Sequence, residues 1–91
     1  MKVITMHPVD ATQLVSVGYD GDTETLYIEF KGEIVYKYLE VPLNVFNNLK
    51  NSSSPGRFFV SSIRQFYDYS KTNLVVRNGL MTLQYEPNQI R

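Results

Sequence analysis

The chain has 91 residues and no net charge, because nine lysines and arginines balance nine aspartates and glutamates. This length allows one domain, and the charge balance argues against a polybasic protein that attracts nucleic acid through its overall field. The absence of cysteine excludes disulfides, cysteine-ligated zinc and thiol catalysis. Hydrophobic residues make up 43% of the chain, which is enough for a folded core.

Three strands are predicted in the first half of the chain. Residues 14–19 are rich in β-branched and aromatic side chains, and turn-forming residues follow them. Residues 25–31 alternate apolar and polar side chains with a period of two, which is typical of a half-buried strand. Residues 34–41 form the third predicted strand, which Pro42 ends.

Two helices are predicted after the strands. Residues 42–51 carry apolar side chains at helical spacing, and Pro42 suits the first helical position. Ser54 and Pro55 have the residue types of an N-cap and a first-turn proline, which predicts a second helix that continues to about Phe66.

The C-terminal part predicts a β-hairpin. Asn78-Gly79 stands between the β-prone segments 74–77 and 80–85, and this dipeptide is a strong hairpin signal. A lone hairpin is marginal in water, so it must bury its apolar side on a surface. It can add to its own sheet, cover a face of that sheet, or dock on a second copy. We expect the third route and therefore a homodimer, since the preceding domain already looks complete.

The order of elements predicts an α+β fold. It consists of a three-stranded antiparallel meander followed by two short helices on one face, plus a C-terminal β-hairpin. We divide the chain into an N-terminal segment of residues 1–13, a central domain of residues 14–69, and a hairpin extension of residues 70–91.

The register of the second hairpin decides which side chains face the helices. A two-residue type II′ loop at Gly32-Glu33 places Tyr27, Tyr36 and Tyr38 on the face away from the helices. A three-residue loop instead puts Tyr36 and Tyr38 in the core. We adopt the two-residue loop, in which Lys37 falls on the helix face.

Four ordered segments carry a resemblance to a known family. They are Val17-Gly18-Tyr19-Asp20, Leu26-Tyr27-Ile28-Glu29-Phe30, Val35-Tyr36-Lys37-Tyr38 with Val41-Pro42, and Ser54-Pro55-Gly56-Arg57-Phe58-Phe59 with Ile63-Arg64 and Tyr67. Together they resemble the KTSC domain, named for the C-terminus of some lysyl-tRNA synthetases and also found as small stand-alone proteins. The family hallmark Tyr-x-Tyr is matched by Tyr36-Lys37-Tyr38. The association with a synthetase implies RNA as a partner, whereas residues 70–91 depart from the short domain.

Tyrosines form the first group of candidate binding residues. Tyr27, Tyr36 and Tyr38, with Lys37 between the last two, would form an exposed stacking platform of the kind that single-strand RNA binders use. The alternative is that these rings pack against the hairpin or a second subunit, because strands favour tyrosine generally. Glu29 and Glu40 would share this face and repel phosphate.

Two arginines form the second group. Arg57 and Arg64 lie on the polar side of the predicted second helix, about 10 Å apart along its axis. They could bind two phosphates or two acidic side chains. The alternative is pairing within the domain or simple solvation.

The sequence contains no catalytic or metal-binding motif. His7 stands alone in an N-terminal segment that we expect to be flexible, and no nucleophile or phosphate-loop motif is present. Asp20, Asp22 and Glu24 alternate as in a calcium loop, but Thr25 stands where that loop needs glycine. We therefore expect a non-enzymatic binding module without cofactor or metal.

The expected partner is RNA or a protein. The resemblance favours RNA, whereas the zero net charge and the tyrosines and arginines also suit a protein-binding adaptor or inhibitor, including one encoded by a phage. We expect no signal peptide, because residues 1–8 are too short and too polar for a signal-peptide core, and no apolar run approaches the roughly 20 residues of a membrane span. We expect a cytoplasmic protein without membrane contact.

Overall fold

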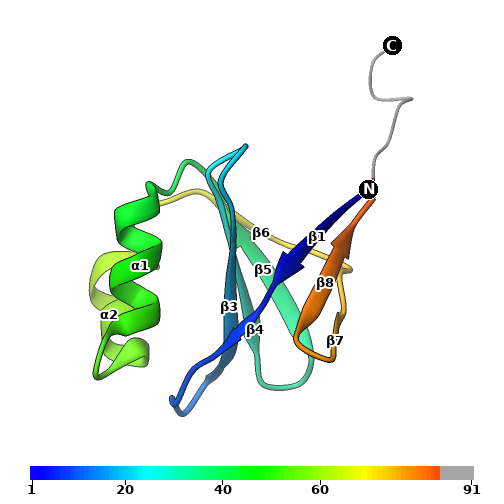
Figure 1. The fold of residues 1–91 in the computed structure, drawn as a ribbon. Helices are drawn as coiled ribbons and strands as arrows, with labels where there is room; N and C mark the ends of the chain where they lie inside the picture. The colour runs from blue at the N-terminus through cyan, green and yellow to red at the C-terminus, as the bar shows by residue number, and fades with distance from the viewer. Residues whose placement is uncertain (85–91) are drawn as a thin grey trace.

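The computed structural model describes residues 1–84, which form two antiparallel sheets and two helices (Figure 1). The elements in chain order are β1 (Lys2–Thr5), β2 (His7–Pro8), β3 (Leu14–Asp20), β4 (Thr25–Phe30), β5 (Ile34–Tyr38), α1 (Leu43–Asn51), α2 (Pro55–Ser62), β6 (Tyr69–Lys71), β7 (Val76–Arg77) and β8 (Leu80–Leu83). The predicted α+β class, with both helices on one face of the sheet, is confirmed.

The main sheet has five strands in the order β2-β3-β4-β5-β6. Its centre, β3-β4-β5, is the predicted meander. After α2 the chain returns as β6, which pairs with β5 so that Tyr69 lies opposite Tyr38. The sequence did not predict β2 or β6, because each has only two or three residues and is defined by its partner strand.

The predicted register between β4 and β5 is wrong. Ile28 pairs with Tyr36 and Leu26 pairs with Tyr38, so the loop between the strands has three residues, 31–33. A type II′ turn needs positive φ at its first central residue only, whereas Gly32 (φ 92°) and Glu33 (φ 62°) both have it. A one-residue slip moves every side chain of a strand to the other face. Tyr36 and Tyr38 therefore face the helices.

The larger core lies between the main sheet and the helices. It contains the sheet residues Leu14, Val17, Leu26, Ile28 and Tyr38, the β5–α1 residue Val41, and the helix residues Phe46, Leu49 and Phe59 with Ile63 just after α2. Because α2 ends at Ser62, earlier than predicted, Phe66 is 67% exposed and does not join this core. Neither helix of residues 1–84 is long and apolar enough to cross a membrane.

A second sheet, the strand layer, covers the opposite face of the main sheet (Figure 1). It has three strands in the order β1-β8-β7. The core between the two sheets contains Ile4, Met6, Tyr27, Val35 and Met81. The main sheet is thus covered by helices on one face and by strands on the other.

The predicted hairpin at Asn78-Gly79 is confirmed. Both residues have positive φ, 54° and 76°, as a type I′ turn requires, and Arg77 pairs with Leu80 across it. Tyr85, at the end of the predicted second strand, lies outside the described residues. The hairpin covers its own sheet, the second of the three routes. Exchange between two copies would keep these same contacts, so a homodimer through the hairpin stays a prediction.

The N-terminal segment is built into the fold, so the expected flexibility is wrong for β1 and β2. A Cβ atom on Gly18 would lie 2.5 Å from Met6 Sδ and 2.8 Å from the Thr5 carbonyl oxygen, so glycine lets the N-terminal chain cross β3 closely. The Lys2 ammonium donates hydrogen bonds to Asp20 at 2.8 Å and to Asp22 at 2.7 Å. These contacts fasten the strand layer to the end of β3.

Candidate functional site

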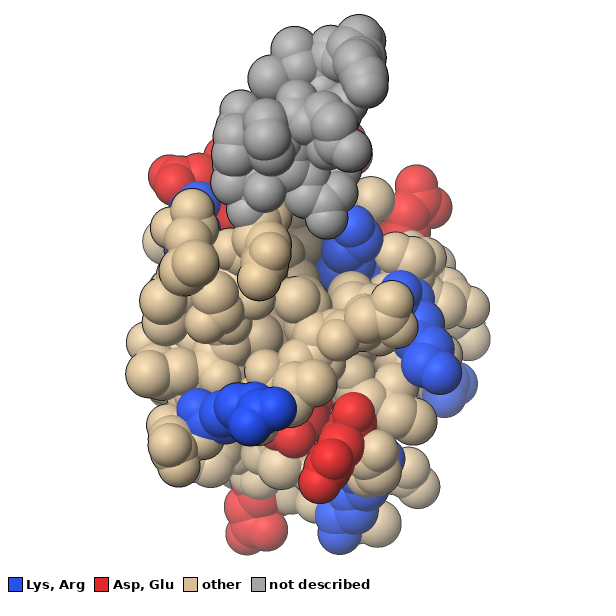
Figure 2. Space-filling view, turned by 90° about the vertical axis from the view of Figure 1, so that its right-hand side faces the viewer, with Lys and Arg blue, Asp and Glu red and all other residues tan. Residues whose placement is uncertain are grey.

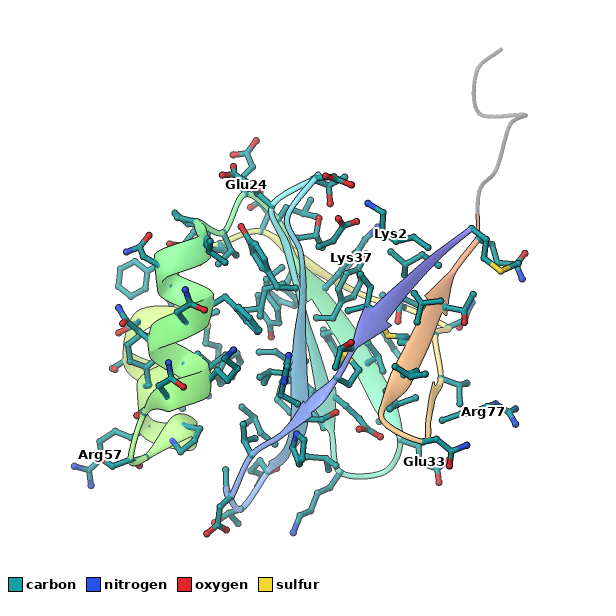
Figure 3. The ribbon with its side chains drawn as sticks, in the orientation of Figure 1. Lys2, Glu24, Glu33, Lys37, Arg57 and Arg77 are labelled. Atoms are coloured by element: carbon teal, nitrogen blue, oxygen red, sulfur yellow. The ribbon has the colours of Figure 1, made fainter. Side chains whose placement is uncertain are left out.

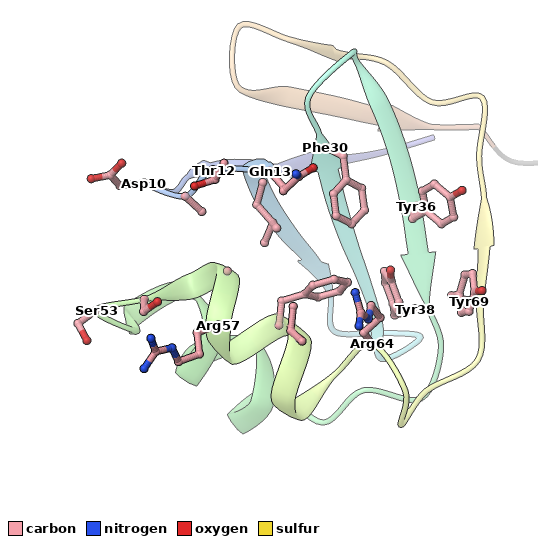
Figure 4. Close-up of a pocket in the computed structure, with 16 residues that line it drawn as sticks. Asp10, Thr12, Gln13, Phe30, Tyr36, Tyr38, Ser53, Arg57, Arg64 and Tyr69 are labelled. Carbon is pink, nitrogen blue, oxygen red and sulfur yellow. The ribbon is translucent and has the colours of Figure 1, made fainter.

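An open groove with a volume of about 1050 Å³ lies on the helix side of the main sheet (Figure 4). One wall is the segment before β3, which includes Asp10 and Gln13. Strands β4, β5 and β6 contribute aromatic side chains, and α2 with the residues that flank it contributes Arg57 and Arg64. The groove therefore combines an aromatic floor with a polar, partly cationic rim.

The aromatic floor is a connected cluster of rings. Tyr38 stacks on Tyr69 with their ring centroids 5.6 Å apart, and its other contact is with the edge of Phe59 at 5.6 Å. Phe30 contacts Tyr36 edge-on at 5.7 Å and Phe59 at 5.6 Å. These separations and tilts are those that aromatic pairs prefer, so the rings hold one another in place.

The three tyrosines of the groove differ in how far their side chains are exposed to solvent. Tyr69 is 58% exposed and presents a ring to solvent, and Tyr36 is half-buried. Tyr38 is only 3% exposed, so the prediction of an exposed Tyr38 is wrong. The wrong register explains this error, since the correct one turns Tyr36 and Tyr38 toward the helices. Tyr69 and Tyr36 are the rings that a ligand can reach.

Tyr38 is also the tyrosine with the most perturbed acidity in the groove. Burial raises the pKa of its hydroxyl, and the neighbouring Tyr69 and Tyr36 raise it further, while Arg64 lowers it, with a net value of about 12. The phenol is therefore neutral and able to donate a hydrogen bond at physiological pH.

The structure brings the two predicted arginines to the groove, although not on one helix. Arg57 lies in the first turns of α2, and Arg64 follows the end of that helix, where its backbone N–H bonds the Phe59 carbonyl oxygen at 2.9 Å. Among residues 1–84 the ion pairs are those of Lys2, so neither arginine is paired with a carboxylate. Asp10 is the one acidic residue that lines the groove.

Tyr27 and Lys37 do not belong to this groove. Tyr27 points away from the helices as predicted, but the strand layer covers it and leaves it 7% exposed, so the prediction of an exposed ring is wrong. Lys37 lies opposite Tyr27 in the sheet and is half-buried on that same side rather than on the helix face (Figure 3). The alternative that a tyrosine packs against the hairpin holds for Tyr27.

The face of the strand layer carries only a smaller pocket within residues 1–84, with a volume of about 480 Å³, lined by residues of β7, β8 and the segments around them. Figure 2 shows this face with small, separate groups of basic and acidic side chains on a mostly uncharged surface. Within residues 1–84 no group of three or more histidine, aspartate or glutamate side chains is arranged to hold a metal ion. The groove is therefore the candidate site.

Sequence reasoning missed Tyr69, the most exposed ring of the groove. The signal was a second Tyr-x-Tyr, Tyr67-Asp68-Tyr69, which directly follows the predicted end of the second helix at about Phe66. In the structure Tyr69 begins β6, which places its ring beside Tyr36 at a centroid distance of 5.9 Å. A three-residue strand has no period long enough to recognise.

Comparison with known proteins identifies the family. The KTSC domain model matches residues 10–76, a span that includes β6 and both arginines of the groove. The chain belongs to the KTSC domain family. A crystal structure of a KTSC domain protein from Yersinia pestis has a TM-score of 0.72 and 33% sequence identity, and the match covers 76% of this chain and 97% of that one. The resemblance seen in the sequence is thereby confirmed.

Two relatives show where this KTSC domain recurs. A protein of Tsukamurella paurometabola is 40% identical over 53 residues, which cover 58% of this chain and 79% of that protein. A lysine–tRNA ligase of Trichormus variabilis is 38% identical over 53 residues, which are 58% of this chain but only 9% of the ligase. The chain thus resembles a small part of that enzyme.

Proposed function

We propose that this KTSC domain protein is a non-enzymatic binding module that holds a short segment of single-stranded RNA in the groove. Bases stack on Tyr69 and Tyr36, while Arg57 and Arg64 bind phosphates. The observation that carries the proposal is that an exposed aromatic ring and two arginines line the same groove, and that neither arginine has a carboxylate partner within residues 1–84.

The chemistry of the groove suits a single strand. A base stacked on an aromatic side chain contributes about 1–3 kcal/mol and needs no particular sequence. The planar guanidinium of arginine matches phosphate oxygens, and Arg57 and Arg64 outnumber the one carboxylate of the groove, that of Asp10. Because the chain has no net charge, binding depends on this local site and not on long-range attraction.

The relatives add support of a different kind. Lysine–tRNA ligases of Trichormus variabilis and a Nostoc strain contain a stretch similar to this chain. An RNA partner fits the name of those enzymes. We place the protein in the cytoplasm, which the absence of cysteine fits.

Salt dependence of RNA binding tests the proposal. Fluorescence anisotropy with a labelled single-stranded RNA is measured over a range of salt concentrations for the wild type and for the double variant Arg57→Gln/Arg64→Gln. Two phosphate contacts predict a slope of log affinity against log salt of about −1.4, which the double variant should lose. The control is Arg77→Gln, which removes an exposed arginine of β7 outside the groove. An unchanged slope in the double variant contradicts the proposal.

A protein partner is the second candidate. Strand β6 is an edge of the main sheet and borders the groove through Tyr69, so an extended peptide could pair with it. Tyrosine and arginine are also the residues that dominate protein interfaces. An adaptor or inhibitor of this kind would keep its partner after nuclease treatment of a lysate, whereas RNA-dependent capture would be lost.

A further inference from the structure

The buried Tyr38 phenol has a hydroxyl that no residue of 1–84 satisfies. The side chain is 3% exposed and lines the groove, yet its hydroxyl makes no hydrogen bond among the interactions of the described residues. No fully enclosed side-chain polar atom among residues 1–84 lacks a partner, so this oxygen keeps some contact with solvent. Buried polar groups normally have partners. No residue of 1–84 supplies this partner, which solvent or a ligand in the groove can provide.

Arg64 lines the same groove as Tyr38. Its charge is close enough to lower the pKa of Tyr38 against the opposing effect of burial, and Figure 4 shows the two side chains together in the groove. Tyr38 keeps its proton at physiological pH and so offers an O–H donor beside the N–H donors of the guanidinium. Donors of both kinds lie at this end of the groove (Figure 4), and an anion with several oxygens can accept from both.

We propose, on the basis of the proposed RNA-binding function, that this end of the groove is a subsite for the terminal phosphate of a nucleotide chain, bound by the Tyr38 hydroxyl and the Arg64 guanidinium. Tyr69, stacked on Tyr38 and largely exposed, then carries the terminal base. Arg57, which lies elsewhere along the groove on α2, is left for a following phosphate.

Depth argues for a terminal phosphate over an internal one. A phosphodiester continues as a chain on both sides, so it approaches a side chain that is only 3% exposed less easily than a group at a chain end does. A terminal phosphate projects from its chain, offers three free oxygens, and carries a charge of about −1.5 to −2 near neutral pH. The extra charge suits the Arg64 guanidinium, and the free oxygens can accept hydrogen bonds from both that group and the Tyr38 hydroxyl.

The test compares three forms of one RNA hexanucleotide, with a 5′-phosphate, with a 3′-phosphate, or with hydroxyls at both ends. One phosphorylated form should bind the wild type about tenfold tighter than the unphosphorylated form, the gain expected of a hydrogen bond to a charged group. Tyr38→Phe removes only the hydroxyl and should abolish this preference. The matched control Tyr27→Phe removes a buried hydroxyl on the other face of the main sheet. This control should keep the preference for the phosphorylated RNA.

The outcomes separate this inference from the proposed function. Equal affinity for the three forms, or a preference that Tyr38→Phe keeps, overturns the subsite while RNA binding in the groove stands. Binding of a nucleoside monophosphate that depends on Tyr38, without binding of the hexanucleotide, supports the subsite and overturns the RNA proposal. Displacement of the phosphorylated probe by a peptide only when its C-terminus is a free carboxylate overturns the nucleotide assignment.

Discussion

The two faces of the main sheet each bury a tyrosine, and the comparison shows how the covering layer decides the role of a side chain. Tyr27 lies under the strand layer, where Met6, Val35 and Met81 join it in a closed core. Tyr38 lies on the helix side at a similar exposure, 3% against 7%, but there the cover is incomplete and leaves the groove. One residue type thus serves packing alone on one face and borders a candidate site on the other.

The difference lies in how the covering elements are arranged over each face. The strand layer is formed by both ends of the chain, and β1 pairs with β8 along all four of its residues. On the helix side α2 has only eight residues, and the chain leaves it to return as β6 at the edge of the main sheet. A short helix therefore leaves β5 and β6 open to a ligand.

The largest expected effect is on stability, from truncation of either buried tyrosine. Tyr27→Ala and Tyr38→Ala should each lower the free energy of unfolding by about 3–5 kcal/mol, as truncation of a buried aromatic side chain does. Urea denaturation followed by circular dichroism measures it. A variant with the stability of the wild type would show that its ring is not part of a core, and the comparison of the two faces would fail there.

A smaller loss of stability is expected where the N-terminal chain crosses β3. Gly18→Ala places a Cβ atom within 2.8 Å of the Thr5 carbonyl oxygen, and a backbone atom cannot yield easily, so we expect a loss of about 1–3 kcal/mol. Gly21→Ala is the matched control, because its Cβ would meet only a Tyr19 ring atom at 3.9 Å. Equal stability of the two variants in urea denaturation would contradict the close crossing.

Truncation of the exposed ring should affect binding more than folding. Tyr69→Ala should weaken RNA affinity by about 1–3 kcal/mol, the contribution of one stacked base. It should lower the free energy of unfolding by no more than about 1.5 kcal/mol, the contribution of an aromatic pair, because the ring stacks on Tyr38. Lys37→Gln, on the side of the strand layer, should change neither. Anisotropy titrations with thermal melts check both variants. A larger loss of affinity for Lys37→Gln than for Tyr69→Ala would move the site to the other face.

The smallest effect concerns acid stability of the strand layer. Burial raises the pKa of the Asp20 carboxyl, but the Lys2 ammonium and the Asp22 backbone N–H outweigh it, so the folded pKa lies below the ordinary 3.8. A depressed folded pKa adds stability that is complete above the unfolded pKa and is lost as the pH falls through the folded one. The wild type should therefore lose more stability than Asp20→Asn as the pH falls below 3.8. Parallel losses in urea denaturation at each pH would contradict this role of Asp20.

The parts of the fold that the sequence predicted depend on local chemistry. The period of two over residues 25–30 and the Asn78-Gly79 turn act within a few residues, and both are confirmed. The strands β1, β2 and β6 are short and form because a partner strand is present, which no local pattern reveals. The register between β4 and β5 was predicted wrongly because the glycine in the loop of residues 31–33 fits several turn types.

The sequence predicted only part of the candidate site, because local patterns identify residue types but not the partner strands that bring them together. Arg57 and Arg64 were chosen as functional, and both line the groove even though α2 ends before Arg64. Tyr36 and Tyr38 also line it, but the wrong register had placed them on the other face. Tyr69 was missed because it joins the groove through β6. Residue types were thus easier to predict than the face on which they lie.

Chemical shift mapping tests most directly the claim that the open helix side, and not the strand layer, is the ligand site. A phosphorylated RNA hexanucleotide is titrated into the isotope-labelled protein while backbone amide resonances are followed. The largest changes should fall on residues 10–14, on residues 53–64 and on Tyr69, while those of β1 and β8 stay in place. Changes concentrated on β1 and β8, with the groove unaffected, would contradict the account.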